Sequence, residues 1–170
     1  MPEGEFVEKK EKELTDDQIN LIMSSKELRN YVLLLIGYGK NLEFQEKDLA
    51  RSLNAKSEEE LERKIRDMAI IALSELIDAV GYRTLESNIM CTLRHETTSF
   101  GDNLTWLECS TTAEGERAEH LLLPPEKIIY YTTKSGDKYE VHVFANIPEG
   151  ENINTSKILY TVTVEPATQS

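Results

Sequence analysis

The stretch from Ser57 to Gly81, SEEELERKIRDMAIIALSELIDAVG, constrains the fold of this chain more than any other. Ser57 and Glu60 have the spacing of a helix-capping box, and Gly81 predicts the end of the helix. The apolar residues first follow one stripe and then, from Met68 onward, cover nearly the whole circumference. A helix with this pattern must enter a hydrophobic core, so we predict that it is the central helix of the fold.

Shorter helices are predicted before it. Thr15 and Gln18 form a second possible capping box, and Ser24 with Glu27 repeats the signal. One continuous helix across Ser24 and Ser25 is the alternative to a break there. We expect a short helix from Thr15, a helix from about Ser25 to Tyr38 that Gly37 and Gly39 end, and a short amphipathic helix over Glu43–Leu53. The core stripe of the second helix is Leu28, Tyr31, Val32 and Leu35.

After Tyr82 the hydrophobic period changes from 3.6 to 2, which is typical of strands. Strands are predicted over 88–98, 104–111, about 127–133, 139–145 and 157–164, with turns at 99–102 and 135–137. Helices followed by strands indicate an α+β fold, with an N-terminal helical bundle and an antiparallel sheet of about five strands. The predicted domains are a disordered lead (1–14), a helical domain (15–85) and an antiparallel β domain (86–170).

The chain is acidic, with a net charge of −12 over 170 residues. This charge argues against tight nucleic-acid binding by the protein alone. It is typical of a protein that meets basic protein partners, or of one that its charge simply keeps soluble. The first residues lack the pattern of a secretory signal, and no apolar run approaches the roughly 20 residues of a membrane helix. We therefore expect a cytoplasmic protein without membrane contact. Its many Glu and Lys residues are compatible with a thermophile's surface.

Positive charge gathers in one part of the sequence, which we call the basic strip: Lys47, Arg51, Lys56, Arg63, Lys64 and Arg66. We expect the last three on the solvent side of the central helix. One interpretation is ordinary surface charge balanced by neighbouring glutamates. The other is a local strip that contacts nucleic-acid phosphates, weakly and without sequence specificity.

The segment from Phe44 to Met68 superficially resembles a helix-turn-helix. Its second helix begins with Ser57 followed by three glutamates, which would repel phosphate. Sequence-specific DNA recognition is therefore disfavoured.

The two cysteines lie on predicted neighbouring strands, and the simplest register puts Cys91 opposite or nearly opposite Cys109. We expect two reduced, buried thiols. The alternatives are a cross-strand disulfide, as hyperthermophiles use, and half of a metal site with His95 nearby. Neither cysteine has the local sequence of an activated nucleophile, and no phosphate-binding glycine motif is present. We expect no catalytic residues, no metal and no cofactor.

The helical half, YVLLLIGYGKNLEFQEKDLARSLN followed by SEEELERKIRDMAIIALSEL, resembles the small subunit of archaeal type I-A Cascade, a CRISPR-guided DNA surveillance complex. The resemblance covers about half the chain and lies in size and element order. It implies a non-catalytic structural subunit that packs beside other protein subunits near nucleic acid, in antiviral defence. A helix-turn-helix regulator with a dimerising or ligand-binding β domain, and an unrecognised enzyme, are the alternatives.

Overall fold

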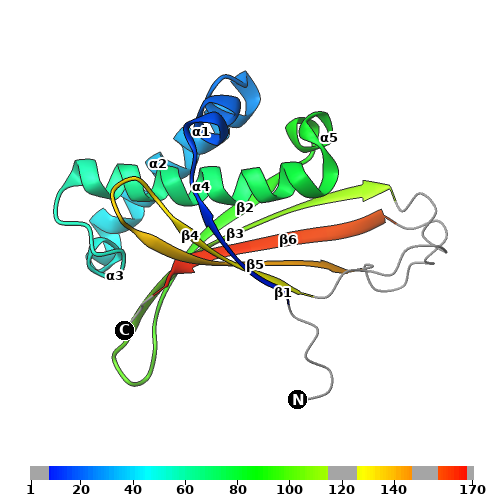
Figure 1. The fold of residues 1–170 in the computed structure, drawn as a ribbon. Coiled ribbons are helices and arrows are strands. Elements are labelled where there is room, and N and C mark those ends of the chain that lie inside the picture. Colours follow the sequence, from blue (N-terminus) through cyan, green and yellow to red (C-terminus); the bar gives the residue numbers. More distant parts are fainter. Residues whose placement is uncertain (1–7, 115–125, 147–156, 168–170) are drawn as a thin grey trace, which may run out of the picture.

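The computed structural model describes residues 8–114, 126–146 and 157–167. The protein is a mixed α and β structure, in which helices cover one face of a single sheet (Figure 1). The longest helix runs across the sheet, and the other helices lie around it. This arrangement confirms a central helix and a mainly antiparallel sheet.

The sheet has six strands in the order β1-β4-β5-β6-β3-β2. Among the described strands only the β1–β4 pair is parallel. The five predicted strands are confirmed, and β1 is the one that the sequence analysis missed. The strands are β1 Glu8–Glu13, β2 Met90–Thr97, β3 Asn103–Glu114, β4 Lys127–Thr132, β5 Lys138–Asn146 and β6 Lys157–Pro166.

The predicted central helix is α4, and most of its residues are buried. Ser57 accepts a hydrogen bond from the Glu60 amide, while the Glu60 carboxylate accepts one from Lys56, one residue earlier than in a standard capping box. Among the described residues no helix is long and apolar enough to cross a membrane. The helices are α1 Asp16–Met23, α2 Lys26–Glu46, α3 Leu49–Ser52, α4 Glu58–Val80 and α5 Tyr82–Ser87.

Helices and strands share one hydrophobic core. Met68 of α4 lies in the same cluster of buried side chains as Leu28 of α2 and Val162 of β6. The apolar surface of α4 is buried on several sides, because the helix lies between the sheet and the other helices. Burial of this kind stabilises a fold by about 25 cal/mol per Å² of apolar surface.

The prediction of a disordered lead over residues 1–14 is wrong for residues 8–13, which form β1. The strand has only Glu and Lys, so no hydrophobic alternation marks it. Lys12 explains how such a strand is held, because its Nζ lies 2.9 Å from an oxygen of the buried Glu75 carboxylate in α4. Leu14 is also buried, and its amide donates to the Thr132 carbonyl. Residues 1–7 lie outside the described residues.

The prediction that Gly37 and Gly39 end a helix is also wrong, because α2 continues through both to Glu46. A Cβ placed on Gly39 would lie 2.3 Å from Ile65 Cδ1, so this glycine permits the close approach of α2 and α4. The helix ends at Lys47, which has a φ of 69°. The predicted helix over Glu43–Leu53 is accordingly split between the end of α2 and α3.

The break at Ser24 and Ser25 and the capping box of Thr15 with Gln18 are confirmed. Ser25 caps α2 by accepting from the Leu28 amide.

The expectation of reduced cysteines is wrong, because Cys91 and Cys109 form a disulfide. The predicted register is confirmed: the two residues face each other on β2 and β3, with their Cα atoms 4.0 Å apart. The error came from an argument about cellular compartment, since cytosolic disulfides are rare. The opposed register of the two cysteines allowed the bond.

Candidate functional site

The basic strip does not form one surface. Lys64 is only 6% exposed, and its Nζ donates to Asp137 Oδ1 over 3.1 Å. Arg63 donates to the other oxygen of the same carboxylate over 2.8 Å. The prediction that Arg63, Lys64 and Arg66 all lie on the solvent side of the helix is therefore wrong for Lys64. Lys64 is buried because the β4–β5 turn places the Asp137 carboxylate against α4, where it pairs with the Lys64 ammonium group.

The turn that carries Asp137 is itself well ordered by hydrogen bonds. The Asp137 amide donates to Thr133 Oγ1, and the Gly136 amide donates to the Thr133 carbonyl. Gly136 has a φ of 89°, a conformation that favours glycine. The carboxylate is thus presented to α4 by a turn of defined shape, and the ion pairs tie this turn to the central helix.

Burial and charge act in opposite directions on the two carboxylates of this cluster. Partial burial alone would raise the pKa of Asp137, but the hydrogen bonds from Arg63 and Lys64 outweigh it and hold the pKa below its ordinary value. Asp67 is more deeply buried, so desolvation raises its pKa, although Arg66 and Arg63 oppose the shift. The arginines of α4 therefore serve a local charge network.

The remaining members of the basic strip, Lys47, Arg51 and Lys56, are exposed around α3 and the start of α4. Arg51 has a side chain that is 79% exposed and lies 3.9 Å from Asp48. A pair of this kind contributes little to stability. Phosphate contact by the strip stays a prediction, and these three residues are the ones free to make it without breaking the Asp137 cluster.

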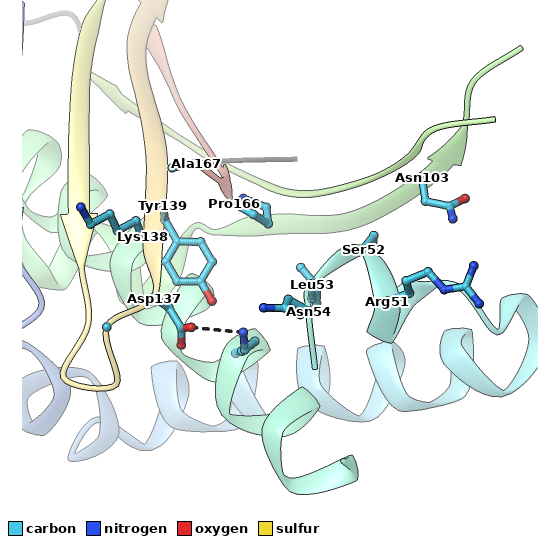
Figure 2. A pocket seen from close by; sticks show the side chains of 12 residues that line it. Arg51, Ser52, Leu53, Asn54, Asn103, Asp137, Lys138, Tyr139, Pro166 and Ala167 are labelled. Atoms are coloured by element: carbon cyan, nitrogen blue, oxygen red, sulfur yellow. Dashed lines mark hydrogen bonds and ion pairs between the residues drawn. The ribbon is translucent and has the colours of Figure 1, made fainter. Parts of the chain in front are cut away.

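A pocket of about 490 Å³ lies between α3 and the β4–β5 turn (Figure 2). Its volume is in the range of small-molecule sites. Figure 2 shows the Tyr139 ring between Asp137 and the Leu53–Asn54 segment. The lining residues are Arg51, Ser52, Leu53, Asn54, Lys64, Asn103, Gly136, Asp137, Lys138, Tyr139, Pro166 and Ala167.

The polar side chains of the pocket are mostly engaged within the chain. Its lining holds three cationic side chains and one carboxylate, Asp137, which is already engaged by cations. Ser52 donates to the Leu49 carbonyl and contacts Thr105, whose hydroxyl in turn lies 2.8 Å from His95 Nδ1. No base among the described residues is hydrogen-bonded to the Ser52 hydroxyl directly. Burial raises the pKa of Tyr139, whose hydroxyl has no hydrogen-bond partner among the described residues. The hydroxyl itself is sealed from solvent, and a ligand could not reach it as the structure stands.

A second surface region, on α2, is uncharged and largely apolar. We define the α2 outer face as the eight exposed residues that follow one side of α2 from Asn30 to Gln45, and none of them is charged. The exposed Lys26 and Glu27 continue this side toward the start of the helix. Large apolar side chains dominate it, and Phe44 is 82% exposed. The residues are Asn30, Leu33, Leu34, Gly37, Tyr38, Asn41, Phe44 and Gln45.

A groove of about 580 Å³ continues the α2 outer face toward the start of α4. Phe44 and Asn41 belong to both, and the groove adds Ala50, Ala55 and Leu61. Its rim is charged, since Lys40 lies within 2.8 Å of Glu58 and 2.6 Å of Glu62. An apolar centre with a polar rim is the usual anatomy of a protein–protein interface.

The structure counts against a helix-turn-helix. The first helix of the suggested motif is reduced to the four residues of α3, and the second is α4, which is packed on the sheet. A recognition helix must present one side to the major groove. In α4 every residue from Asp67 to Leu76 is buried, so this stretch has no side free to enter a groove.

The sequence analysis singled out neither Asp137 and Tyr139 as site residues nor the α2 outer face. The turn at 135–137 was visible, but nothing local shows which helix it meets. For α2 a usable signal was present: Leu33 and Leu34 are apolar yet lie outside the core stripe of Leu28, Val32 and Leu35. Comparisons with known proteins identify no matching family model, no similar curated protein and no similar solved structure.

Proposed function

We propose that this protein is a non-catalytic subunit of a larger assembly and that it docks onto a basic protein partner through the α2 outer face. The observation that carries the proposal is the absence of charge on this exposed helix surface. Charged residues make up 29% of the chain, yet the eight exposed positions of the α2 outer face contain none.

The exposed apolar side chains are large enough to supply binding energy. Leu34 and Phe44 are among the most exposed apolar residues in the described part of the chain. Aromatic side chains that enter a partner's pocket are frequent hot spots of protein interfaces. Gly37 lies between them and has open space around it, so a partner can approach the helix backbone closely.

The net negative charge of the chain favours a basic partner over a second copy of the same chain. Two copies would each carry −12, and their long-range repulsion opposes self-association. A basic protein is attracted instead by the net charge of the chain. The rim of the groove is locally balanced, since Glu43 and Glu58 lie beside Lys40 and Lys56. Subunits that hold nucleic acid carry positive surface, which fits a nucleoprotein assembly.

The identity of the assembly rests on the sequence resemblance alone, which suggests the archaeal type I-A Cascade. In this proposal the protein is held mainly by its partner subunits. Its direct contact with nucleic acid comes from Lys47, Arg51 and Lys56, and it is weak and non-specific, at roughly 10⁻⁴–10⁻⁶ M for the isolated protein.

The test is reconstitution with an identified partner. A tagged chain is cross-linked in its native cells, the bound proteins are identified by mass spectrometry, and the main one is purified for calorimetry. We expect this partner to be basic. Phe44→Asp should weaken its binding at least tenfold, because it places a charge in the interface.

Phe100→Asp is the matched control, because Phe100 is even more exposed, at 91%, but lies on the β2–β3 turn. It should leave the affinity unchanged. Equal affinities of the two variants, or binding only to a second copy of the chain, would overturn the proposal.

A further inference from the structure

His142 lies on the face of the sheet opposite the helices. In β5 its neighbours Val141 and Val143 are buried, so the alternating side chains of Glu140 and His142 point the other way. Glu140 is paired with Glu165 of β6 in the strand register. Two adjacent strands thus bring one imidazole and two carboxylates together on the outer face of the sheet.

These three groups are close enough to share one ion. The Nε2 atom of His142 is 2.7 Å from Glu140 Oε2, and one potential ligand atom from each of Glu140, His142 and Glu165 lies within 4.8 Å of the others. Ligand bonds to Zn²⁺ are about 2.0–2.2 Å, so ligand atoms around a tetrahedral ion are about 3.4 Å apart. Small rotations of the carboxylates would reach this geometry.

We propose that Glu140, His142 and Glu165 form a zinc site that links β5 to β6. Imidazole nitrogen and carboxylate oxygen are both normal zinc ligands. Three protein ligands leave the fourth position for water, and all three residues are half-buried, so solvent can reach it. The site is independent of the α2 outer face and lies on the other side of the molecule.

A fourth residue supports this assignment independently. The Nδ1 atom of His142 is in close contact with the carboxylate of Glu126, just before β4. A carboxylate on the second ring nitrogen is the usual companion of a zinc-bound histidine, since it fixes the tautomer and orients the ring. Glu126 thus holds Nδ1, and Zn²⁺ would take the place of the direct contact between Nε2 and Glu140.

The local charge favours a divalent cation. The carboxylates of Glu126, Glu140 and Glu165 place three negative charges around one imidazole. All three groups come from strands or strand ends of one sheet, whose register limits how far they can separate. Zn²⁺ would offset two of these charges and replace the proton that otherwise lies between Nε2 and Glu140.

The experiment is calorimetric titration of untagged, EDTA-treated protein with ZnCl₂. We expect one ion per chain. His142→Ala and Glu165→Gln should each weaken binding more than tenfold, and Glu126→Gln should weaken it roughly 10–100-fold, as the loss of an orienting carboxylate does in other zinc sites. Glu108→Gln is the matched control, because Glu108 lies on β3 beside Arg94 and outside the three ligands.

Cobalt gives a second readout, since Co²⁺ bound in a tetrahedral site of nitrogen and oxygen ligands has an absorption band in the visible range. This band should be absent when Co²⁺ is added to His142→Ala. Circular dichroism confirms that each variant is folded. Failure to bind Zn²⁺, or equal binding by His142→Ala and the unaltered chain, would overturn the zinc site. So would a loss of binding in Glu108→Gln as large as in Glu165→Gln, because it would indicate a diffuse acidic surface. No partner protein is needed, so this result is independent of the proposed function.

Discussion

The first half of α4 and the outer face of α2 reverse the usual relation between charge and exposure. In α4, Lys64 is buried and, together with Arg63, bound to Asp137. In α2, Leu34 and Phe44 are uncharged and face solvent. Arg63 and Lys64 of α4 form ion pairs within the chain. By contrast, no described residue covers the exposed apolar side chains of α2. We infer that α4 serves the fold and α2 serves a partner.

The largest effect should come from charges placed on the two helices. Ile71 of α4 is fully buried, and burying an unpartnered polar group costs roughly 2–7 kcal/mol, so Ile71→Asp should unfold the protein. Leu34→Asp should change the free energy of unfolding by less than about 1 kcal/mol, because Leu34 is 69% exposed. Thermal melts by circular dichroism measure both. Equal melting temperatures would remove the distinction between the two helices.

The next effect concerns the ion pairs of α4. Asp137→Ala leaves the buried Lys64 without its counter-charge and should destabilise the protein by about 1–3 kcal/mol. Asp48→Ala is the control, because its partner Arg51 is exposed and the Asp48 side chain does not cap α3. It should cost less than about 0.5 kcal/mol. Urea titrations of both variants give the comparison, and a larger loss for Asp48→Ala would show that the Asp137 cluster is not structural.

The Asp137 cluster should also give stability a pH dependence. The pKa of Asp137 is lower in the folded protein than in the unfolded chain, so folding favours its ionised form. This contribution is complete above the unfolded pKa of about 3.9 and disappears as pH falls through the folded pKa. Asp67 has a raised pKa and acts in the opposite direction, gaining stability as pH falls.

Melting temperatures of the unaltered chain and Asp137→Asn separate the two carboxylates. The difference between them should be large at pH 6 and shrink below about pH 4. A difference that stays constant across this range would show that charge is not what Asp137 contributes.

The smallest effects are expected at two glycines of α2. Gly37 has open space around it, so Gly37→Ala should stabilise the protein by about 0.5–1 kcal/mol through better helix propensity. At Gly39 the new methyl group would meet Ile65, and the displaced side chain lies in the core, so Gly39→Ala should lose this gain or destabilise. Chemical denaturation resolves the difference. If both variants gain equally, α2 does not approach α4 as closely as described.

The parts of the fold that local patterns determine could be predicted from the sequence. The capping residue Ser57 and the apolar circumference after Met68 identified α4, and alternation identified five strands. The opposition of Cys91 and Cys109 followed from the short turn between their strands. In each of these cases the signal lies within the segment itself or within one hairpin.

Features that depend on distant contacts could not be predicted. Strand β1 has no apolar residue, and its place depends on distant residues, through its pairing with β4 and the ion pair of Lys12 with Glu75. The local sequence predicts that Lys64 is exposed. It is buried because it pairs with Asp137, which lies 73 residues later in the chain. The proposed zinc ligands could not be predicted from the sequence either, because β5 and β6 become neighbours only in the folded sheet.

Hydroxyl-radical footprinting of the free protein and of its complex with the identified partner tests most directly whether the α2 outer face is the docking surface. Tyr38 and Phe44 should be oxidised readily in the free protein and strongly protected in the complex. Phe100, exposed on the β2–β3 turn, should react equally in both states. Protection of Phe100 without protection of Phe44 would contradict the assignment and place the partner at another surface.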